Sequence, residues 1–248
     1  MTTREKNVFF DINKLPAEKG LMIFPISMSR ANTGQTPKQL VEYIFHFSPN
    51  KITAPNVGIN FIYGDFLYMW SNEKASKLKA KYMEVVWNHK NALQKIIYGH
   101  RKDFQIQEAF DYMTWNQFYI TSKEFVFYFQ QLKLIYKKDK LFQKYVREDA
   151  RVFKKKLNQN TINFFLEEHT LMYLMNKMKI EFPNVYIRGL QEWILLCYPG
   201  NPPKALIYVM QKNFFKLPKV QIYEGQYNLE TKKYIDYANV DLETYAVK

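Results

Sequence analysis

The chain has 248 residues, of which 17% are aromatic, so it can bury a sizeable core and is globular rather than disordered. Its formal net charge is +13, which is typical of a protein that binds nucleic acid or an anionic surface, and equally of a lysine-rich soluble protein. The single cysteine, Cys197, excludes an internal disulfide and a multi-cysteine metal site. Because the sequence has no apolar run of membrane-spanning length and no signal-peptide core, we expect a cytoplasmic protein without metal or membrane contact.

The N-terminal part of the chain predicts the beginning of a parallel α/β sheet. Residues 21–26 form a short apolar run that is typical of a buried strand, and this run ends at Ser27. After a polar loop, Thr36 is expected to cap a helix that has Pro37 at its first position. Residues 57–63 predict a second strand, and the order strand, loop, helix, strand indicates a parallel α/β unit.

The remaining elements are predicted mainly as helices. A long helix is expected from about Glu73 to Tyr98, because a buried face recurs every 3.6 residues at Leu78, Tyr82, Val85, His89, Ala92 and Ile96. Phe104 and Ile106 indicate a short strand. The later expectations are helices over residues 122–136, 139–157 and 161–178, extended chain over 185–198, a helix from Pro202 to Met210, and one strand after Leu217.

The first candidate for chemistry is Ser27, which lies where a buried strand gives way to a loop. Ligands of α/β proteins bind at the carboxyl ends of strands, so a serine at this position is a candidate nucleophile. The alternative is a serine that only ends the strand or bonds to loop backbone.

The second candidate is Glu168, on a helix that is apolar nearly all round and therefore predicted to be buried. It shares one face with Phe164, Leu171 and Met175, at steps of four, three and four residues. A buried carboxylate needs a partner, which is either a substrate ammonium or a Lys or Arg of the protein itself. Its neighbour Glu167 is expected to point elsewhere.

The third candidate is Tyr198, which ends an apolar strand just before Pro199 and Gly200. A tyrosine held over a pocket can pass protons, whereas the alternative is an ordinary half-buried ring. Cys197, inside the strand, is interpreted as a packed core residue.

Two groups of lysines could follow a phosphate backbone, or could simply be solvated helix faces. In the first group, Lys74, Lys77 and Lys81 share one face of the long predicted helix. The second group consists of Lys137, Lys138, Lys140, Lys144, Lys154, Lys155 and Lys156. The sequence has neither a phosphate loop ending in Gly-Lys-Ser or Gly-Lys-Thr nor a Gly-x-Gly-x-x-Gly motif, so no cofactor is expected.

Together these segments resemble the tRNA-dependent cyclodipeptide synthases. The family has a nucleophilic serine after its first strand, and Ile23-Phe24-Pro25-Ile26-Ser27 occupies that place, with Pro25 where glycine is common. A family helix has an aromatic residue four positions before a glutamate, which aligns with Phe164 and Glu168, although tyrosine is usual where Phe164 stands. The late family motif is a tyrosine after an apolar strand, matched by Tyr198.

Arg30, three residues after the serine, and Pro199, directly after the tyrosine, resemble the branch of the family that has Tyr-Pro in the late motif. The resemblance implies one Rossmann-like catalytic domain over residues 1–248, with a core at about 20–225. It also implies a parallel sheet flanked by helices, similar to the catalytic domains of class I tyrosyl- and tryptophanyl-tRNA synthetases. A monomer is the family precedent.

The activity that the resemblance implies is an aminoacyl transfer between two aminoacyl-tRNAs, which gives a cyclic dipeptide (diketopiperazine), a secondary metabolite. Ser27 would carry an aminoacyl ester, Glu168 would bind the substrate ammonium, and Tyr198 would relay protons. The implied tRNA contacts are Lys74, Lys77 and Lys81. The implied substrate pocket is formed by Ile23, Pro25, Arg30, Ile62, Phe164, Leu171 and Leu196.

Two other functions fit parts of the sequence. A non-catalytic tRNA- or RNA-binding domain would explain the charge of +13 but gives no role to Ser27, Glu168 and Tyr198. An aminoacyl-tRNA synthetase would need the ATP-binding motifs of that class, and these are absent from the sequence. Trapping of an ester on Ser27 distinguishes a synthase from the non-catalytic RNA-binding domain. An ATP–pyrophosphate exchange assay distinguishes it from an aminoacyl-tRNA synthetase.

Overall fold

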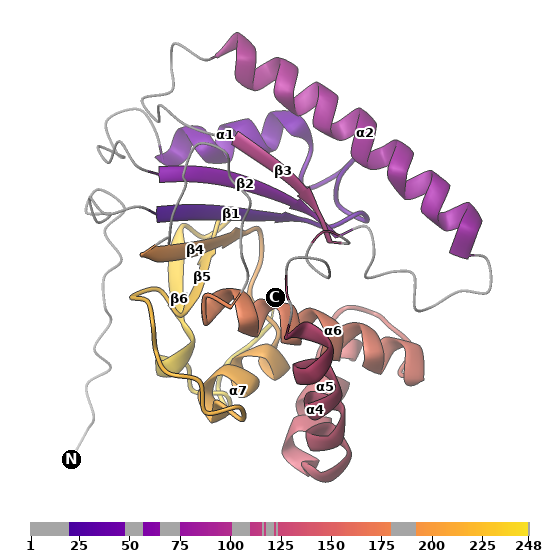
Figure 1. Ribbon diagram of the computed structural model, residues 1–248, viewed down its shortest axis with the longest axis vertical. Helices are drawn as coiled ribbons and strands as arrows, with labels where there is room; N and C mark the ends of the chain where they lie inside the picture. Colours follow the sequence, from indigo (N-terminus) through magenta and orange to yellow (C-terminus); the bar gives the residue numbers. More distant parts are fainter. Residues whose placement is uncertain are drawn as a thin grey trace.

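A six-stranded, mostly parallel sheet with helices on both faces forms the centre of the molecule (Figure 1). The computed structural model describes residues 20–47, 57–64, 75–100, 110–115, 117, 122, 124–179 and 192–247. The strand order is β3-β2-β1-β4-β5-β6. The first five strands are parallel, and β6 pairs antiparallel with β5 at one edge. The bounds are Gly20–Ile26 for β1, Val57–Tyr63 for β2, Phe110–Thr114 for β3, Trp193–Tyr198 for β4, Gly225–Asn228 for β5 and Lys233–Asp236 for β6.

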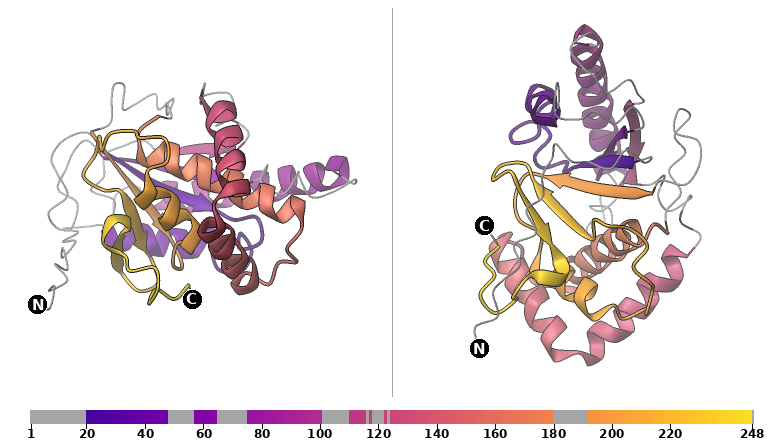
Figure 2. Two further views of the ribbon diagram at one scale, coloured as in Figure 1. Left: turned by 90° about the horizontal axis from the view of Figure 1, so that it is seen from below. Right: turned by 90° about the vertical axis from the view of Figure 1, so that its left-hand side faces the viewer.

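The described helices divide between the two faces of the sheet, as the views in Figures 1 and 2 show. One face carries α1 (Pro37–Phe47) and α2 (Ala75–Gly99). The other carries α4 (Phe125–Lys138), α5 (Lys140–Val152), α6 (Gln159–Asn176) and α7 (Lys204–Lys212). A short 3-10 helix, η3 (Tyr237–Asn239), follows β6. The predicted α/β class with a parallel sheet between helices is therefore confirmed.

The central strands β1, β2 and β4 are largely apolar because helices cover both of their faces. All seven residues of β1 are buried, and they alternate between two cores. Leu21 and Ile23 belong to the core under α4 to α7, whereas Met22, Phe24 and Ile26 belong to the core under α1 and α2. The period of two therefore decides which helix layer each residue of β1 contacts.

The helix α1 begins where Thr36 and Pro37 predicted it. The Thr36 hydroxyl accepts a hydrogen bond from the Gln39 amide at 3.3 Å, and the Gln39 side chain accepts one from the Thr36 amide at 3.0 Å. This reciprocal pair satisfies two amides that have no partner inside the helix. Pro37 is the first helical residue, as predicted.

Several predicted boundaries and faces differ from the structure. On α2, Ala92 is exposed while Leu93 and Ile97 are buried, because the helix packs on the sheet through a stripe at His89, Leu93 and Ile97. The helix α5 ends at Val152 rather than at residue 157, and Lys154 just beyond it has φ of 52°, which a helix cannot contain.

The strand predictions met three different outcomes. The expected strand at Phe104 and Ile106 lies outside the described residues, and the sequence prediction missed β3. One strand was expected after Leu217, but two are present. The β5–β6 hairpin was missed because its strands have only four residues each and consist largely of polar or half-buried side chains.

None of the helices in the described ranges combines the length and the hydrophobicity needed to cross a bilayer.

The cap of α7 gives the first prediction. Asp149 is fully buried, and its carboxylate accepts hydrogen bonds from the Lys204 and Ala205 amides at 3.0 and 2.8 Å. Asp149→Ala leaves one buried and one partly buried amide donor without acceptors, so the free energy of unfolding should fall by about 1–3 kcal/mol. Urea denaturation measures this change. The neighbouring Glu148→Ala, which removes only partly exposed ion pairs, should change the free energy of unfolding by less than about 1 kcal/mol; equal losses would contradict the capping role.

Candidate active site

Ser27 lies directly after β1, and a single side chain holds the chain on both sides of it. The Gln35 side-chain oxygen accepts a hydrogen bond from the Ser27 amide at 2.9 Å, and its side-chain nitrogen donates to the Pro25 carbonyl at 2.7 Å. The Arg30 and Ala31 amides donate to the Ser27 carbonyl, both at 2.9 Å. These bonds fix the backbone of the turn that presents the Ser27 hydroxyl. That hydroxyl is 2.9 Å from the hydroxyl of Ser29.

Tyr198 ends β4, the strand that pairs with β1 on the side opposite β2. The register pairs Ile23 with Leu196, and both side chains lie in the core under α6. Two residues after Leu196, Tyr198 points to the same face, and continuing the alternation of β1 from Ile23 places Ser27 there as well. The nucleophile candidate and the tyrosine therefore stand at the same edge of neighbouring strands, above α6.

Arg30 joins the loop after β1 to the end of β4. Its guanidinium lies 5.7 Å from the centre of the Tyr198 ring, and its Nη1 donates to the Pro199 carbonyl at 2.8 Å. The Glu230 carboxylate is 3.9 Å from the same nitrogen. The sequence interpretation gave Arg30 a contact with substrate, which stays a prediction; the structure shows that Arg30 orients the Tyr198 segment.

Glu168 is half-buried on α6 among charged groups from other elements. Burial raises its pKa to about 7, although the Lys155 ammonium acts in the opposite direction, and the carboxylate of Asp149 adds to the rise. The Lys155 ammonium also stands 4.3 Å from the centre of the Phe164 ring. One of the two predicted partners, a cation of the protein itself, is therefore present, and the binding of a substrate ammonium stays a prediction.

The same helix holds two further buried ionisable residues, to which the sequence prediction gave no role. Glu167, expected to point elsewhere than Glu168, is fully buried, and so is His169. Burial lowers the pKa of His169 to about 3, so its imidazole is neutral at physiological pH. The apolar character of the helix on all sides was the signal that could have identified both residues.

Five of the seven predicted substrate-lining residues form one continuous group between the sheet and α6. Ile23, Ile62, Leu171 and Leu196 belong to a single buried core cluster, against which Phe164 packs. Pro25 is paired with Ile62 in the sheet. The structure thus brings together residues from β1, β2, α6 and β4 that are far apart in the sequence.

The predicted tRNA contacts are only partly covered by the structure. Lys74 lies outside the described residues, and so does the side chain of Lys77, although its backbone belongs to α2. Lys81 is exposed on α2. Contact of these lysines with tRNA stays a prediction.

The fold of this chain is similar to that of several solved structures. The chain superposes on a cyclodipeptide synthase from Fluoribacter dumoffii with a TM-score of 0.54 and 13% identity, over 90% of this chain and 91% of that one. The fold is that of the cyclodipeptide synthases. A cyclodipeptide synthase from Staphylococcus haemolyticus gives a TM-score of 0.52 at 12% identity, over 85% of this chain and 90% of the other.

A cyclodipeptide synthetase from Mycobacterium tuberculosis, a protein that demonstrates the relationship of these enzymes to type I tRNA synthetases, gives a TM-score of 0.50 at 13% identity, over 84% of this chain and 82% of the other. No protein-family model matches the chain. No curated protein matches it either. The likeness to the cyclodipeptide synthases therefore concerns the fold.

The charge environment of Glu168 predicts a pH dependence. If its carboxylate binds the substrate ammonium, acylation of the protein by aminoacyl-tRNA should increase as the pH rises through about 7, where Glu168 ionises. Lys155→Met removes the charge that holds this pKa down, so the midpoint should move to higher pH. Initial acylation rates between pH 6 and 8.5 measure the midpoint, and the substrate amine titrates identically with both proteins.

Lys156→Met, a change of the exposed neighbour, is the matched control and should leave the midpoint in place. If the pH midpoint of acylation is the same in Lys155→Met and in the unaltered protein, the pH dependence does not come from Glu168, and its role in substrate binding is rejected.

Proposed function

We propose that this protein is a tRNA-dependent cyclodipeptide synthase, an aminoacyltransferase with Ser27 as its acyl-carrying nucleophile. The observation that supports this most is the position of Ser27 at the carboxyl end of β1, beside Tyr198 at the end of β4, in a fold shared with cyclodipeptide synthases. Carboxyl ends of parallel strands are where α/β proteins bind their ligands.

The proposed reaction begins when the Ser27 hydroxyl attacks the ester carbonyl of an aminoacyl-tRNA. A new ester forms on Ser27, the bond to the tRNA ribose breaks, and the departing ribose hydroxyl takes up the serine proton. The amine of the bound aminoacyl group then attacks the ester of a second aminoacyl-tRNA, which leaves a dipeptidyl ester on Ser27 and releases the second tRNA.

Ring closure completes the proposed cycle. The free amine of the dipeptide attacks the Ser27 ester, forms the second amide bond and returns the serine hydroxyl. Because both ends of the dipeptide are held in one site, this step is intramolecular and gains from their proximity. No step needs ATP, since the aminoacyl-tRNA esters are already activated.

Each of the other site residues has a role in the proposal. The Glu168 carboxylate attracts the substrate ammonium, and the Tyr198 hydroxyl passes protons between amine, ester and leaving group. Arg30 holds Tyr198 through its stacked guanidinium and its bond to Pro199. The buried cluster around Leu171 receives the first side chain, and Lys74, Lys77 and Lys81 contact tRNA phosphates.

The nucleophile is tested by a pair of neighbouring serines. Ser27→Ala should fold normally, yet form no covalent adduct with radiolabelled aminoacyl-tRNA and no cyclic dipeptide, because the attacking oxygen is gone. Ser29→Ala removes the adjacent hydroxyl and should retain at least about a tenth of the acylation, since it loses one neutral hydrogen bond of about 1 kcal/mol. Acid-stable gel labelling and mass spectrometry of diketopiperazines provide the two readouts; unchanged product from Ser27→Ala would reject the mechanism.

The proton relay is tested at Tyr198. Tyr198→Phe keeps the ring under the Arg30 guanidinium and removes only the hydroxyl, so cyclic product should fall roughly 100-fold. Loading of Ser27 should decrease less, because the tRNA ribose is a good leaving group, so the variant should accumulate acylated protein. Trapping of acylated protein and quantification of diketopiperazine on one preparation measure both effects. If a normally folded Tyr198→Phe protein makes wild-type amounts of cyclic product, the hydroxyl has a structural role and does not relay protons.

A further inference from the structure

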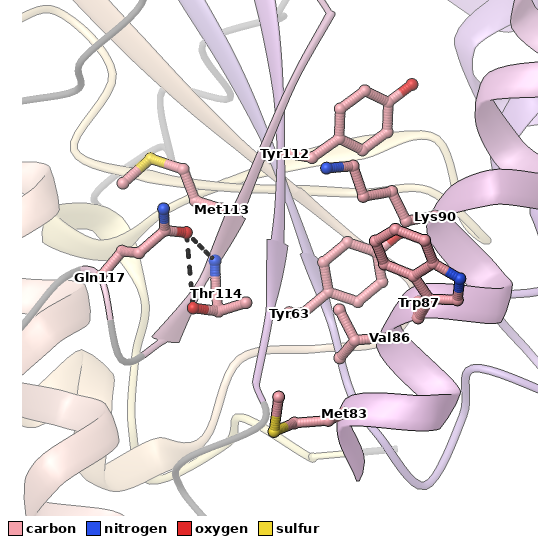
Figure 3. A pocket seen from close by; sticks show the side chains of 9 residues that line it. All are labelled: Tyr63, Met83, Val86, Trp87, Lys90, Tyr112, Met113, Thr114 and Gln117. Atoms are coloured by element: carbon pink, nitrogen blue, oxygen red, sulfur yellow. Dashed lines mark hydrogen bonds between the residues drawn. The ribbon is translucent and has the colours of Figure 1, made fainter.

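A cleft that plays no part in the proposed chemistry opens between α2 and the strand β3, at the carboxyl ends of β2 and β3 (Figure 3). Its volume of about 360 Å³ lies within the range of small-molecule pockets, roughly 300–1,000 Å³. One wall is formed by Met83, Trp87 and Lys90 of α2. The other includes Tyr63 from the end of β2 and Tyr112 from β3.

The α2 wall presents apolar surface together with one cation. Met83, Trp87 and Lys90 follow each other at steps of four and three residues, so they share a face of the helix. Trp87 is 65% exposed and Met83 58% exposed, so two large apolar side chains of one helix face are open to a partner. The Lys90 ammonium stands 5.5 Å from the centre of the Tyr112 ring. Flat rings beside an ammonium match a nucleotide, whose base stacks and whose phosphate carries negative charge.

The charge of the surrounding helix has the sign that a nucleic acid requires. Within its bounds, α2 contains five lysines and a single acidic residue, Glu84. Lys81 and Lys95 are exposed on either side of the cleft along the helix. A polynucleotide that follows α2 therefore meets cations before and after the cleft, which a neutral small molecule would not use.

Hydrogen bonds connect the wall of the cleft to the Ser27 loop. The Tyr63 hydroxyl is 3.0 Å from His89 Nδ1, and His89 Nε2 is 2.8 Å from the Gln35 carbonyl. Burial lowers the pKa of His89, so the ring is neutral; its Nε2 donates to the carbonyl, and its Nδ1 accepts from Tyr63. Gln35 in turn accepts the Ser27 amide. The cleft and the candidate nucleophile thus belong to one rigid network at the same edge of the sheet.

We propose that the cleft binds an unpaired nucleotide of the 3′ end of a tRNA, with its base against Trp87 and its phosphate near Lys90. This inference rests on the proposed function, because a tRNA presents its aminoacyl ester on that unpaired end. Holding one nucleotide next to the Ser27 network fixes the path of the strand and so limits where the ester carbonyl can lie.

The test compares two RNAs with two proteins. We would measure the affinity of the unaltered protein and of Trp87→Ala for two RNAs. One RNA is a full tRNA transcript, and the other is the same transcript without its unpaired 3′ nucleotides. Loss of a stacked base should weaken binding of the full transcript roughly 5- to 100-fold. The shortened transcript lacks the base, so Trp87→Ala should change its affinity by less than about twofold.

Matched variants separate stacking from general effects. Tyr98→Ala removes another exposed ring of α2, 67% exposed and outside the cleft, and should leave both affinities within about twofold. Trp87→Phe keeps a ring and should restore most of the loss. A Trp87→Ala protein with unchanged affinity for the full transcript overturns the proposal, as does an equal loss with both transcripts. If adenosine monophosphate binds as tightly as the full transcript, the cleft is a site for a free nucleotide rather than for an RNA end, and the proposal is overturned as well.

Failure of this inference is distinct from failure of the proposed function. Ser27→Ala keeps the cleft and should bind the full transcript with unchanged affinity. If acylation of Ser27 occurs while Trp87→Ala binds normally, the synthase proposal stands and the cleft proposal is rejected. If no acylation occurs while Trp87→Ala loses affinity for the full transcript alone, the cleft is an RNA-end site in a protein that is not a cyclodipeptide synthase.

Discussion

The parallel pairing of β1 with β4 is the contact on which the candidate site depends. Each strand is covered by helices on both faces, so each is apolar throughout and their register leaves little freedom. At the start of the pair, Gly20 lies against the Trp193 ring, and a side-chain carbon at that position would come within 1.9 Å of a ring atom. The absence of a side chain at Gly20 therefore lets the strands align, and this alignment brings the ends of both strands to one edge.

Beyond the strand ends, hydrogen bonds from polar side chains, rather than sheet pairing, fix the backbone. Gln35 is fixed from three directions, since its side chain holds Pro25 and Ser27 while its carbonyl accepts from His89. Arg30 performs the corresponding task for Tyr198 and Pro199. A loop that positions a candidate nucleophile needs this kind of support, because its backbone has no strand hydrogen bonds of its own. Both supporting residues come from the same short segment between β1 and α1, so one stretch of loop orients both ends of the candidate site.

The sequence predicted elements best where a local rule acts strongly. Residues 21–26 are a continuous apolar run, residues 57–63 are apolar apart from Gly58 and Asn60, and Thr36 begins a helix with a cap, so these elements are where they were expected. The strand β3 was missed because it lies at a sheet edge with mostly half-buried residues, which leaves no clear period. Ser27, Glu168 and Tyr198 were singled out from their places in such runs, whereas Gln35 and Lys155 act through contacts across the fold. Nothing in the residues beside them in the chain indicates that Gln35 meets His89 or that Lys155 meets Phe164.

The contact between Arg30 and Pro199 spans 169 residues of sequence, and this separation has a consequence for synthesis of the protein on the ribosome. Because the chain emerges from its N-terminus, Ser27 leaves the ribosome long before β4 exists to pair with β1. During that interval β2 is already available to pair with β1, but Ser27 lacks both the β4 strand on its other side and Tyr198 at the end of β4. Long-range pairing of this kind also forms late in folding, since the loop between the strands must close first. The order of the strands thus delays assembly of the candidate site until most of the chain has been made.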